Sequence, residues 1–239
     1  MRALLLAAGL GTRLRPLTND IPKCLVPING QPLIDYWFDN LFKSGIERIL
    51  VNKHYFADRV TDHIARSPWK DRIDQVYEPD LVGTGGTLAA NLDYFQNQPL
   101  FLAYADNLSD VDVRAMQAAH DKRPKGCVMT MLAFETDNPQ SCGILELDAD
   151  NMVRAFHEKV PNPPGNLANG AVMIIEPEVG AAAQAVNKPL IDLSVDVIPN
   201  FLGRIQAHRH TGYHRDIGNP RSLAQAEADL AAGVVKVRK

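Results

Sequence analysis

Two glycines and two cations stand close together near the start of the chain. Residues 3–8 form an apolar run that leads directly into Gly9, Gly11 and Arg13, and Lys23 follows ten positions later. Glycine lets the backbone approach a ligand closely, and successive N–H groups in such a turn form a nest for anions. Arginine can hold two phosphate oxygens at once, whereas lysine acts as a point charge. The spacing therefore predicts a loop that binds a polyphosphate.

This glycine loop differs from two common phosphate-binding motifs. G-L-G-T-R lacks the third glycine of G-x-G-x-x-G, and it does not match G-x-x-x-x-G-K-[ST] either. A tight turn that leaves Arg13 and Lys23 in solvent is the simpler alternative. The loop taken by itself leaves both interpretations open.

Further polar groups follow later apolar runs. Asp106 comes directly after the run 99–105, and a second glycine turn, Gly83–Gly86, opens a predicted helix. Ligands of open α/β sheets bind outside the carboxyl ends of the strands, so we expect these groups to share a crevice. A buried carboxylate without a partner is costly, and Mg²⁺ would remove that cost. Asp216, after a late strand, is the second candidate ligand, although either aspartate could instead cap a helix or a turn.

The first half of the chain alternates predicted strands with predicted helices. Strands are expected at residues 3–8, 48–51, 73–77 and 99–105, and helices at 32–44, 58–65 and 84–92. Uninterrupted apolar strands suit a parallel sheet that is covered on both faces. The order predicts an α/β fold: a single doubly wound, Rossmann-like domain with a mostly parallel, mixed central sheet.

The second half of the chain is richer in strands and predicts a small additional lobe. Strands are expected at residues 127–135, 142–147, 152–158, 168–175, 204–209 and 211–216. Helices are expected at residues 178–185, 196–202 and 220–232, followed by a frayed tail at 234–239.

Composition limits the classes of partner. The 239 residues are 46% apolar and carry a net charge of −3, with no basic stripe, so we expect no nucleic-acid partner. No apolar run approaches the roughly 18–20 residues that span a bilayer, so we expect no membrane association. Cys24, Cys127 and Cys142 form no C-x-x-C pair, and their odd number favours a reduced, cytoplasmic location. Three histidines at 208, 210 and 214 suggest surface roles rather than a zinc site.

The motifs resemble those of the sugar-1-phosphate nucleotidyltransferases, in the family's order and along nearly the whole chain. The first loop and P-K-C-L-V-P (22–27) resemble G-x-G-T-R-L and P-K-P-L, with Cys24 in place of a proline. The later matching segments are G-T-G-G-T-L (83–88), Y-A-D-N (104–107), H-E-K (157–159), N-G-A (169–171) and H-R-D-I-G-N-P (214–220).

The resemblance implies a role for each matching residue. The catalytic residues would be Arg13, Lys23 and Asp106, with Lys23 facing the α-phosphate. Mg²⁺ would be held by Asp106 and Asp216. The nucleoside triphosphate would lie on Ala7, Gly9, Gly11, Thr12, Arg13, Glu78, Gly83, Thr84 and Gly85, the last four near the base. The sugar 1-phosphate would contact Asn107, Gly143, Glu158, Lys159, Asn169 and Gly170.

The implied reaction needs no nucleophile from the protein. The sugar phosphate oxygen would attack the α-phosphorus and pyrophosphate would leave, so catalysis rests on positioning and charge stabilisation. Residues 1–125 would bind mainly the nucleotide and residues 126–239 mainly the sugar phosphate. The chain ends soon after Asp216, so no appended left-handed β-helix is expected. A homodimer is an expectation at the level of the family.

The base and the sugar are less well defined than the reaction. G-T-G-G-T-L resembles the segment of guanylyltransferases for mannose 1-phosphate and D-glycero-α-D-manno-heptose 1-phosphate, which favours GTP and a role in polysaccharide biosynthesis. The runner-up is a uridylyltransferase that acts on N-acetylmuramate 1-phosphate or a hexose 1-phosphate. A non-catalytic nucleotide-sugar-binding regulator and a glycosyltransferase are rivals from different functional classes. In a glycosyltransferase the metal motif would be D-V-D at 110–112.

Overall fold

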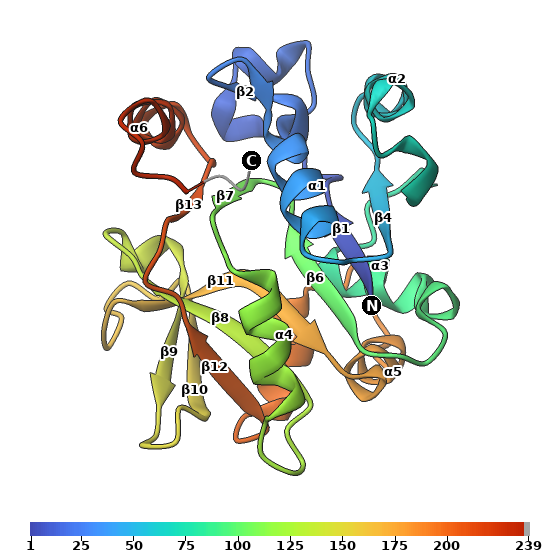
Figure 1. Cartoon of the computed structure of the whole chain (residues 1–239). Coiled ribbons are helices and arrows are strands. Elements are labelled where there is room, and N and C mark those ends of the chain that lie inside the picture. Colours follow the sequence, from blue (N-terminus) through green and yellow to red (C-terminus); the bar gives the residue numbers. More distant parts are fainter. Residues whose placement is uncertain (237–239) are drawn as a thin grey trace. The chain divides into compact units, whose positions relative to one another are not determined.

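The computed structural model describes residues 1–236 and divides the chain into two compact units (Figure 1). Unit 1 comprises residues 1–81, 103–113 and 212–239, and unit 2 comprises residues 82–102 and 114–211. The expected α/β class with a large, mostly parallel, mixed sheet is confirmed. The units are discontinuous in sequence and do not follow a single cut at residue 125. The assignment of residues 1–125 to the nucleotide and 126–239 to the sugar phosphate stays a prediction.

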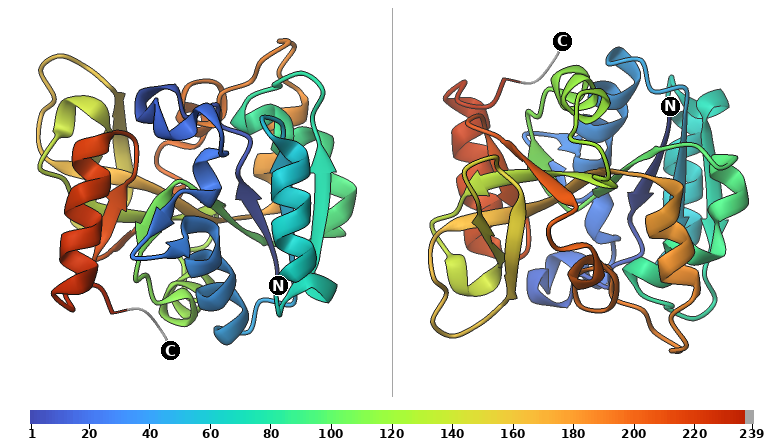
Figure 2. Two further views of the ribbon diagram at one scale, coloured as in Figure 1. Left: turned by 90° about the horizontal axis from the view of Figure 1, so that it is seen from above. Right: turned by 90° about the horizontal axis from the view of Figure 1, so that it is seen from below.

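Unit 1 is built on parallel strands. Strand β1 (Arg2–Leu6) pairs in parallel with β4 (Arg48–Lys53), and β4 pairs in parallel with β5 (Ile73–Tyr77). Figures 1 and 2 show α2, which spans Ala57–Arg66, beside β5. The remaining elements of unit 1 are two short antiparallel ribbons, β2–β3 (Pro27–Ile28 and Gln31–Pro32) and β7–β13 (Asn107–Ser109 and His214–Asp216), and the helices α1 (Leu33–Lys43), α2 (Ala57–Arg66) and α6 (Pro220–Ala231).

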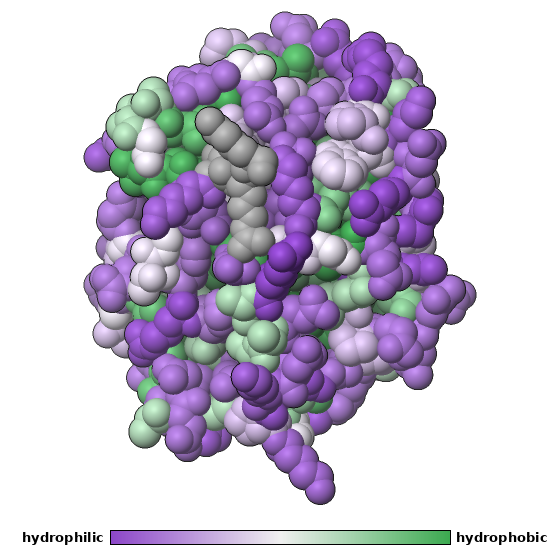
Figure 3. All heavy atoms as spheres, viewed as in Figure 1, coloured by the Kyte–Doolittle hydropathy of each residue, from purple (hydrophilic) through white to green (hydrophobic). Residues whose placement is uncertain are grey.

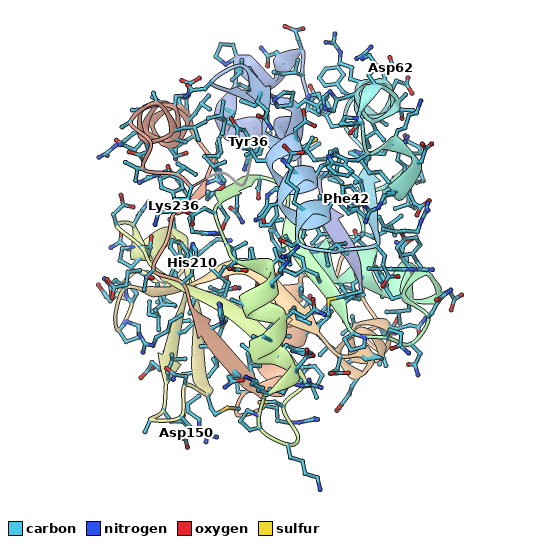
Figure 4. All side chains as sticks on the ribbon, viewed as in Figure 1. Tyr36, Phe42, Asp62, Asp150, His210 and Lys236 are labelled. Carbon is cyan, nitrogen blue, oxygen red and sulfur yellow. The ribbon has the colours of Figure 1, made fainter. Side chains whose placement is uncertain are left out.

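Helix α1 forms because its apolar residues recur at helical spacing and meet a core. Leu33, Trp37 and Leu41 are almost fully buried, and Gly45, with φ of +101°, ends the segment in a conformation that favours glycine. Tyr36 and Phe42 also lie on α1 (Figure 4). Tyr36 packs in a cluster that joins the first loop, the β7–β13 ribbon and α6, and thereby anchors the elements around the candidate site.

Unit 2 is built mainly on antiparallel strands. Its strands follow the order β10 (Val153–Glu158), β9 (Gly143–Leu147), β11 (Leu167–Ile175), β8 (Met129–Glu135) and β12 (Ile205–Arg209). Only the β8–β12 pair in this set is parallel. The main helices are α3 (Thr84–Ala90), α4 (Val113–Asp121) and α5 (Pro177–Gln184). Strand β6 (Leu100–Tyr104) contributes residues to both units.

Short helical turns complete the elements. The 3₁₀ turns span Thr12–Leu14, Leu17–Asn19, Lys23–Leu25, Lys70–Arg72, Leu92–Phe95, Pro139–Ser141 and Ile198–Phe201, and a π-helical turn spans Leu193–Val197. The last two turns replace the single helix expected at 196–202. The remaining predicted helices and strands are present with shifts at their ends.

Helix α4 and strand β7 are among the elements that the sequence pattern does not predict. Helix α4 buries Val113, Met116 and His120. Because His120 is polar, the buried face of α4 does not stand out as an apolar pattern in the sequence. Strand β7 is too short to show any periodicity. Strand β7 depends on its distant partner β13. Helix α4, by contrast, contains the strong helix formers Ala, Met, Arg and Gln, so its local propensity supports a helix.

The end of the chain is partly anchored. Residues 237–239 of the tail expected to be frayed lie outside the described residues. Val235 is buried in the α6 cluster, and the Lys236 N–H donates to Oδ2 of Asp110 over 3.2 Å. This part of the tail is therefore packed rather than frayed.

The surface gives no indication of a bilayer-spanning helix. Among residues 1–236, no helix combines the length and the hydropathy that a membrane crossing requires. The face shown in Figure 3 is mainly hydrophilic.

Candidate active site

The first loop of unit 1 is shaped by a close approach between Gly11 and Lys23. Gly11 has φ of +63°, and a Cβ there would lie 3.1 Å from Cβ of Lys23 and 3.1 Å from Cγ2 of Thr18. The Thr18 hydroxyl donates to the Gly11 carbonyl over 2.7 Å, which holds the turn. Around Gly9, by contrast, no described atom lies within 4 Å of a Cβ. Gly11 is therefore required by packing, whereas Gly9 leaves open space beside the loop.

Lys23 lies between two carboxylates. Its Nζ is 2.7 Å from Oδ2 of Asp106 and 3.3 Å from Oδ1 of Asp216, and the residue is only 7% exposed. The 3₁₀ turn Lys23–Leu25 follows Pro22 and directs this side chain inward. The simpler interpretation of a solvated lysine is therefore wrong.

The β7–β13 ribbon brings the two aspartates together. Asp216 pairs with Asn107 in the ribbon, and the Ile217 N–H donates to the Asp106 carbonyl over 2.9 Å. Trp37 Nε1 of α1 donates to the Asn107 carbonyl over 2.8 Å and fixes the ribbon against unit 1. Asn107 itself is buried and acts here through its backbone.

Arg13 extends the same cluster toward solvent. Its Nη2 lies 3.8 Å from Oδ2 of Asp216, and its side chain is 66% exposed. Thr12 begins the 3₁₀ turn that carries Arg13. A Cβ at Gly218 would lie 2.6 Å from Oδ2 of Asp216 and 3.0 Å from Nη2 of Arg13, so a side chain there would displace this pair. Gly218 is an additional candidate site residue.

The charges of the cluster suit a hard cation. Partial burial, followed by the negative charge of Asp106, raises the pKa of the Asp216 carboxyl, and Lys23 and Arg13 oppose this shift. The two neighbouring carboxylates, Asp106 and Asp216, offer only oxygen atoms as ligands. This fits Mg²⁺, which usually takes one or two carboxylates together with phosphates. No group of three or more His, Cys, Asp or Glu side chains suited to a metal exists among residues 1–236.

A buried hydrogen-bonded chain links the first loop to Glu78. The Ala7 N–H donates to Oδ1 of Asn52 over 2.7 Å, and Nδ2 of Asn52 donates to Oε1 of Glu78 over 3.1 Å. Asn52 and Glu78 are 3% and 7% exposed, so these bonds are shielded from water. The sequence motifs do not point to Asn52. Its signal is a polar residue near the end of the otherwise apolar run Ile49–Val51.

The second glycine turn lies in unit 2. Gly83, Thr84 and Gly85 open α3 and pack directly against the backbone of Ile191. The close packing shows that these glycines have a structural reason of their own.

Gly143 and Glu158 face each other in unit 2. The two residues are register partners on β9 and β10, and a Cβ at Gly143 would lie 2.6 Å from Oε2 of Glu158 and 2.5 Å from Cζ of Phe156. The missing side chain therefore lets the Glu158 carboxylate lie over β9. Glu158 also pairs with Nζ of Lys159 at 2.7 Å.

Backbone irregularities mark the remaining predicted sugar-phosphate residues. Lys159 has φ of +49°, and its N–H donates to the Cys142 carbonyl over 3.1 Å. The β11–β8 register shifts after Asn169, whose Oδ1 accepts from the Ala171 N–H over 2.9 Å. Gly170 is buried within this bulge. Bulges of this kind re-aim side chains and are frequent next to active sites.

The predicted residues thus form four groups inside the units. Unit 1 brings together Arg13, Lys23, Asp106 and Asp216 with the first loop, and it also holds the Ala7–Asn52–Glu78 chain. Unit 2 holds the second glycine turn, and on different elements it brings together Gly143, Glu158 and Lys159, with Asn169 on the neighbouring strand β11.

The rival metal motif at 110–112 has a structural role. Oδ1 of Asp110 accepts from the Tyr213 N–H over 2.7 Å, and Oδ2 accepts from the Lys236 N–H over 3.2 Å. Both carboxylate oxygens thus tie the ribbon and the chain end together. This use does not fit a metal ligand of a glycosyltransferase.

Comparisons with known proteins agree with the pattern of motifs. The family model described as nucleotidyl transferase matches residues 2–233. N-acetylmuramate α-1-phosphate uridylyltransferase of Caulobacter vibrioides is 34% identical over 96% of each chain. Mannose-1-phosphate guanylyltransferase of Mycobacterium tuberculosis is 27% identical over 97% of this chain.

The chain is shorter than two of its relatives, and its fold is similar to that of a solved structure. The chain spans only 65% of the mycobacterial protein and 62% of a relative from Sulfolobus acidocaldarius. The crystal structure of HddC from Yersinia pseudotuberculosis complexed with GMP-PN has a TM-score of 0.80 and 25% identity, and the match covers 96% of this chain and 99% of HddC.

Proposed function

Because the chain belongs to the nucleotidyl transferase family, we propose that it transfers a nucleotidyl group from a nucleoside triphosphate to a sugar 1-phosphate and releases pyrophosphate. The observation that carries this proposal is the position of Lys23 between Asp106 and Asp216, beside a glycine loop that also presents Arg13. A triphosphate brings several negative charges, and this cluster offers two fixed cations and two ligands for a metal.

The residues of unit 1 would position and neutralise the triphosphate. Gly9 leaves room for phosphate oxygens beside the loop, and the exposed guanidinium of Arg13 is accessible to them. The Nζ of Lys23 lies inside the site, where positive charge stabilises a developing negative one most strongly. Asp106 and Asp216 would hold Mg²⁺, which when bound supplies further neutralisation of the phosphate oxygens. Glu78, held by Asn52, is a candidate contact for the base.

The residues of unit 2 would hold the sugar 1-phosphate. Glu158 offers a carboxylate that can accept hydrogen bonds from sugar hydroxyls, and Lys159, 65% exposed, offers a cation for the phosphate. Asn169 and Gly170 would line the sugar pocket. The attacking oxygen belongs to the substrate, which is consistent with a site that offers charges and positioning rather than an activated side chain.

We favour GTP as the nucleotide because G-T-G-G-T-L at 83–88 resembles the guanylyltransferase segment. In addition, the mycobacterial guanylyltransferase and HddC, which was crystallised with GMP-PN, each match nearly the whole chain. Mannose or heptose 1-phosphate is the corresponding acceptor, and the product would serve polysaccharide biosynthesis. UTP with N-acetylmuramate 1-phosphate is the second candidate, supported by the 34% identity to the Caulobacter enzyme over 96% of its length. Three cysteines without disulfides favour a cytoplasmic location. A homodimer stays an expectation.

A pyrophosphate-release screen tests the proposal. GTP, UTP, ATP, CTP and dTTP are each combined with mannose, heptose, glucose and N-acetylmuramate 1-phosphates in the presence of Mg²⁺. We expect pyrophosphate release to be much faster with one nucleotide than with the others, and we expect that nucleotide to be GTP. A folded sample that releases no pyrophosphate with any pair would overturn the proposed activity, and a preference for UTP would replace the guanylyl assignment alone.

A further inference from the structure

A segment distant in sequence holds the second glycine turn of unit 2. We call residues 190–193 the strap. The Ile191 N–H donates to the Val82 carbonyl over 2.9 Å, and the Ile191 carbonyl accepts from the N–H groups of Gly85 and Gly86 over 2.8 and 3.3 Å. The strap therefore lies along the turn on both sides of Gly83 and satisfies two N–H groups at the start of α3, which would otherwise need another partner.

A side chain of the turn completes the attachment. The Leu193 N–H donates to Oγ1 of Thr84 over 2.9 Å, and Leu193 is fully buried. Because Oγ1 accepts this bond, the orientation of the Thr84 hydroxyl is set by the strap. The hydrogen of that hydroxyl can still be donated to an acceptor.

The glycines of the turn are explained by the strap. Gly83 has φ of +83°, and a Cβ there would collide with the Ile191 carbonyl. A Cβ at Gly85 would lie 2.7 Å from Cγ2 of Ile191. Two glycines of G-T-G-G-T-L are thus required by contact with residue 191, independently of any ligand.

The strap has its own support. Oδ1 of Asp192 accepts from the N–H groups of Ser194 and Val195 over 2.7 and 3.2 Å, which caps the following π-helical turn. Oδ2 of Asp196 accepts from the Asp192 N–H over 2.9 Å, and Asp196 also binds Nζ of Lys188. These bonds fix the strap before any ligand arrives.

We propose that the strap positions the turn Gly83–Gly86 for the nucleotide base, so that Ile191 and Leu193 are positioning residues for nucleotide affinity. This inference rests on the proposed function. The N–H groups of Gly85 and Gly86 are engaged by Ile191, so the base meets a turn whose conformation residues 191 and 193 determine. Nucleotide affinity should therefore respond to changes in a segment more than a hundred residues away, as the bond between Leu193 and Thr84 spans 109 positions.

A pair of variants at residue 193 separates the hydrogen bond from the side chain. Leu193→Pro and Leu193→Ala both remove the buried leucine, but only proline removes the N–H. Residue 193 is the first of its helical turn, and Asp192 has φ of −91° and ψ of 123°, a conformation compatible with a following proline. We expect KM for the nucleotide to be about fivefold higher in Leu193→Pro than in Leu193→Ala, with kcat within about twofold. Equal KM values would overturn the proposal.

A second-site rescue tests the contact at Ile191. Gly85→Ala should raise KM for the nucleotide because the new methyl meets Cγ2 of Ile191. Adding Ile191→Ala removes that atom, so KM of the double variant should fall back toward that of Ile191→Ala alone. If Gly85→Ala raises KM equally with and without Ile191→Ala, the glycine acts directly on the ligand and the strap does not position it.

Hydrogen exchange supplies a readout that does not depend on activity. In the unmodified protein without nucleotide, the amides of Gly85 and Gly86 should be protected from exchange. Their exchange should be faster in Leu193→Pro than in Leu193→Ala. If the Gly85 and Gly86 amides exchange without protection in the unmodified protein, the proposed role of the strap is wrong, independently of the measured activity. A protein that turns over normally but shows equal KM values at residue 193 would leave the proposed function standing and remove only this inference.

Discussion

Nζ of Lys23 lies 2.7 Å from Oδ2 of Asp106, although 83 positions separate the two residues in the chain. The same nitrogen reaches Asp216 at 3.3 Å. The loop after β1 therefore delivers its cation to the two acids that the β7–β13 ribbon holds. This relationship makes the charge balance of the cluster the first property to test.

Removing the Lys23 charge should affect both activity and stability. In Lys23→Ala, we expect turnover to fall by about 10²–10³-fold, the range for the loss of one electrostatic contact to a transition state. Two carboxylates would lose their common partner, so the melting temperature should also fall, and Mg²⁺ should restore part of it. Thermal unfolding in EDTA and in Mg²⁺ measures this. Lys43→Ala, which removes a lysine that forms a half-buried i,i+4 pair with Asp39 away from this cluster, is the control. Near-normal turnover in Lys23→Ala would refute the assignment.

Asparagine substitutions distinguish the two candidate metal motifs. Asp106→Asn should lower turnover by at least about 10²-fold, since it removes one of two carboxylates from the cluster. Asp110→Asn should keep kcat within about twofold and lower the melting temperature, because Asp110 accepts from two backbone N–H groups. The reverse pattern in a steady-state assay would favour the D-V-D motif and a glycosyltransferase.

Asn52 should matter to the nucleotide as well as to the fold. Asn52→Ala leaves the Ala7 N–H and Oε1 of Glu78 without this partner, which should cost about 1–3 kcal/mol of stability and raise KM for the nucleotide. Asn40→Ala is the control, because Asn40 is equally buried and donates to the Val111 carbonyl. Denaturant unfolding and KM are measured together. An identical KM in both variants at matched stability would show that Asn52 is structural only.

Gly143 offers a test of the sugar-phosphate residues. The methyl of Gly143→Ala would meet Oε2 of Glu158, so the carboxylate must move and KM for the sugar 1-phosphate should rise. KM for the nucleotide should change little. Gly165→Ala, where no described atom lies within 4 Å of the new methyl, should leave both values unchanged. A rise in KM for the nucleotide alone would contradict the role given to Glu158.

Buried His120 should make stability depend on pH. Its Nδ1 lies 2.8 Å from Oγ1 of Thr130, and burial, with help from the Arg123 charge, lowers its pKa. A histidine with a lowered pKa takes up a proton more readily when unfolded, so its contribution is present above the ordinary value near 6.5 and is lost as pH falls below it. The melting temperature should therefore drop between pH 7.5 and 5.5, and less so in His120→Asn. Equal slopes for the two proteins would remove His120 as the cause.

The sequence predicts the cations and acids of the site better than their supports. Arg13, Lys23, Asp106 and Asp216 are recognisable because charged residues at strand ends and glycine turns follow a familiar order. Asn52 is visible only as a polar residue near the end of an apolar strand, and nothing local names its partners.

The strap and α4 show why some parts are not predictable. Ile191 and Leu193 act through a carbonyl and N–H groups, which every residue type except proline possesses, so the sequence carries no sign of these contacts. Helix α4 is obscured because His120 occupies a buried position that an apolar residue usually takes. For the strap the decisive information is a tertiary contact, whereas α4 is supported by its own strong helix formers.

The β7–β13 ribbon also determines at which stage of synthesis the candidate site can fold. Asp106 is translated well before its neighbour Asp216, and the bond between Ser109 and His214 in the same ribbon spans 105 positions. Contacts of such separation form late, because a long loop must close before they are gained. A nascent chain on the ribosome can therefore complete the first glycine loop early, yet its acidic pair is assembled only after residue 216 has emerged.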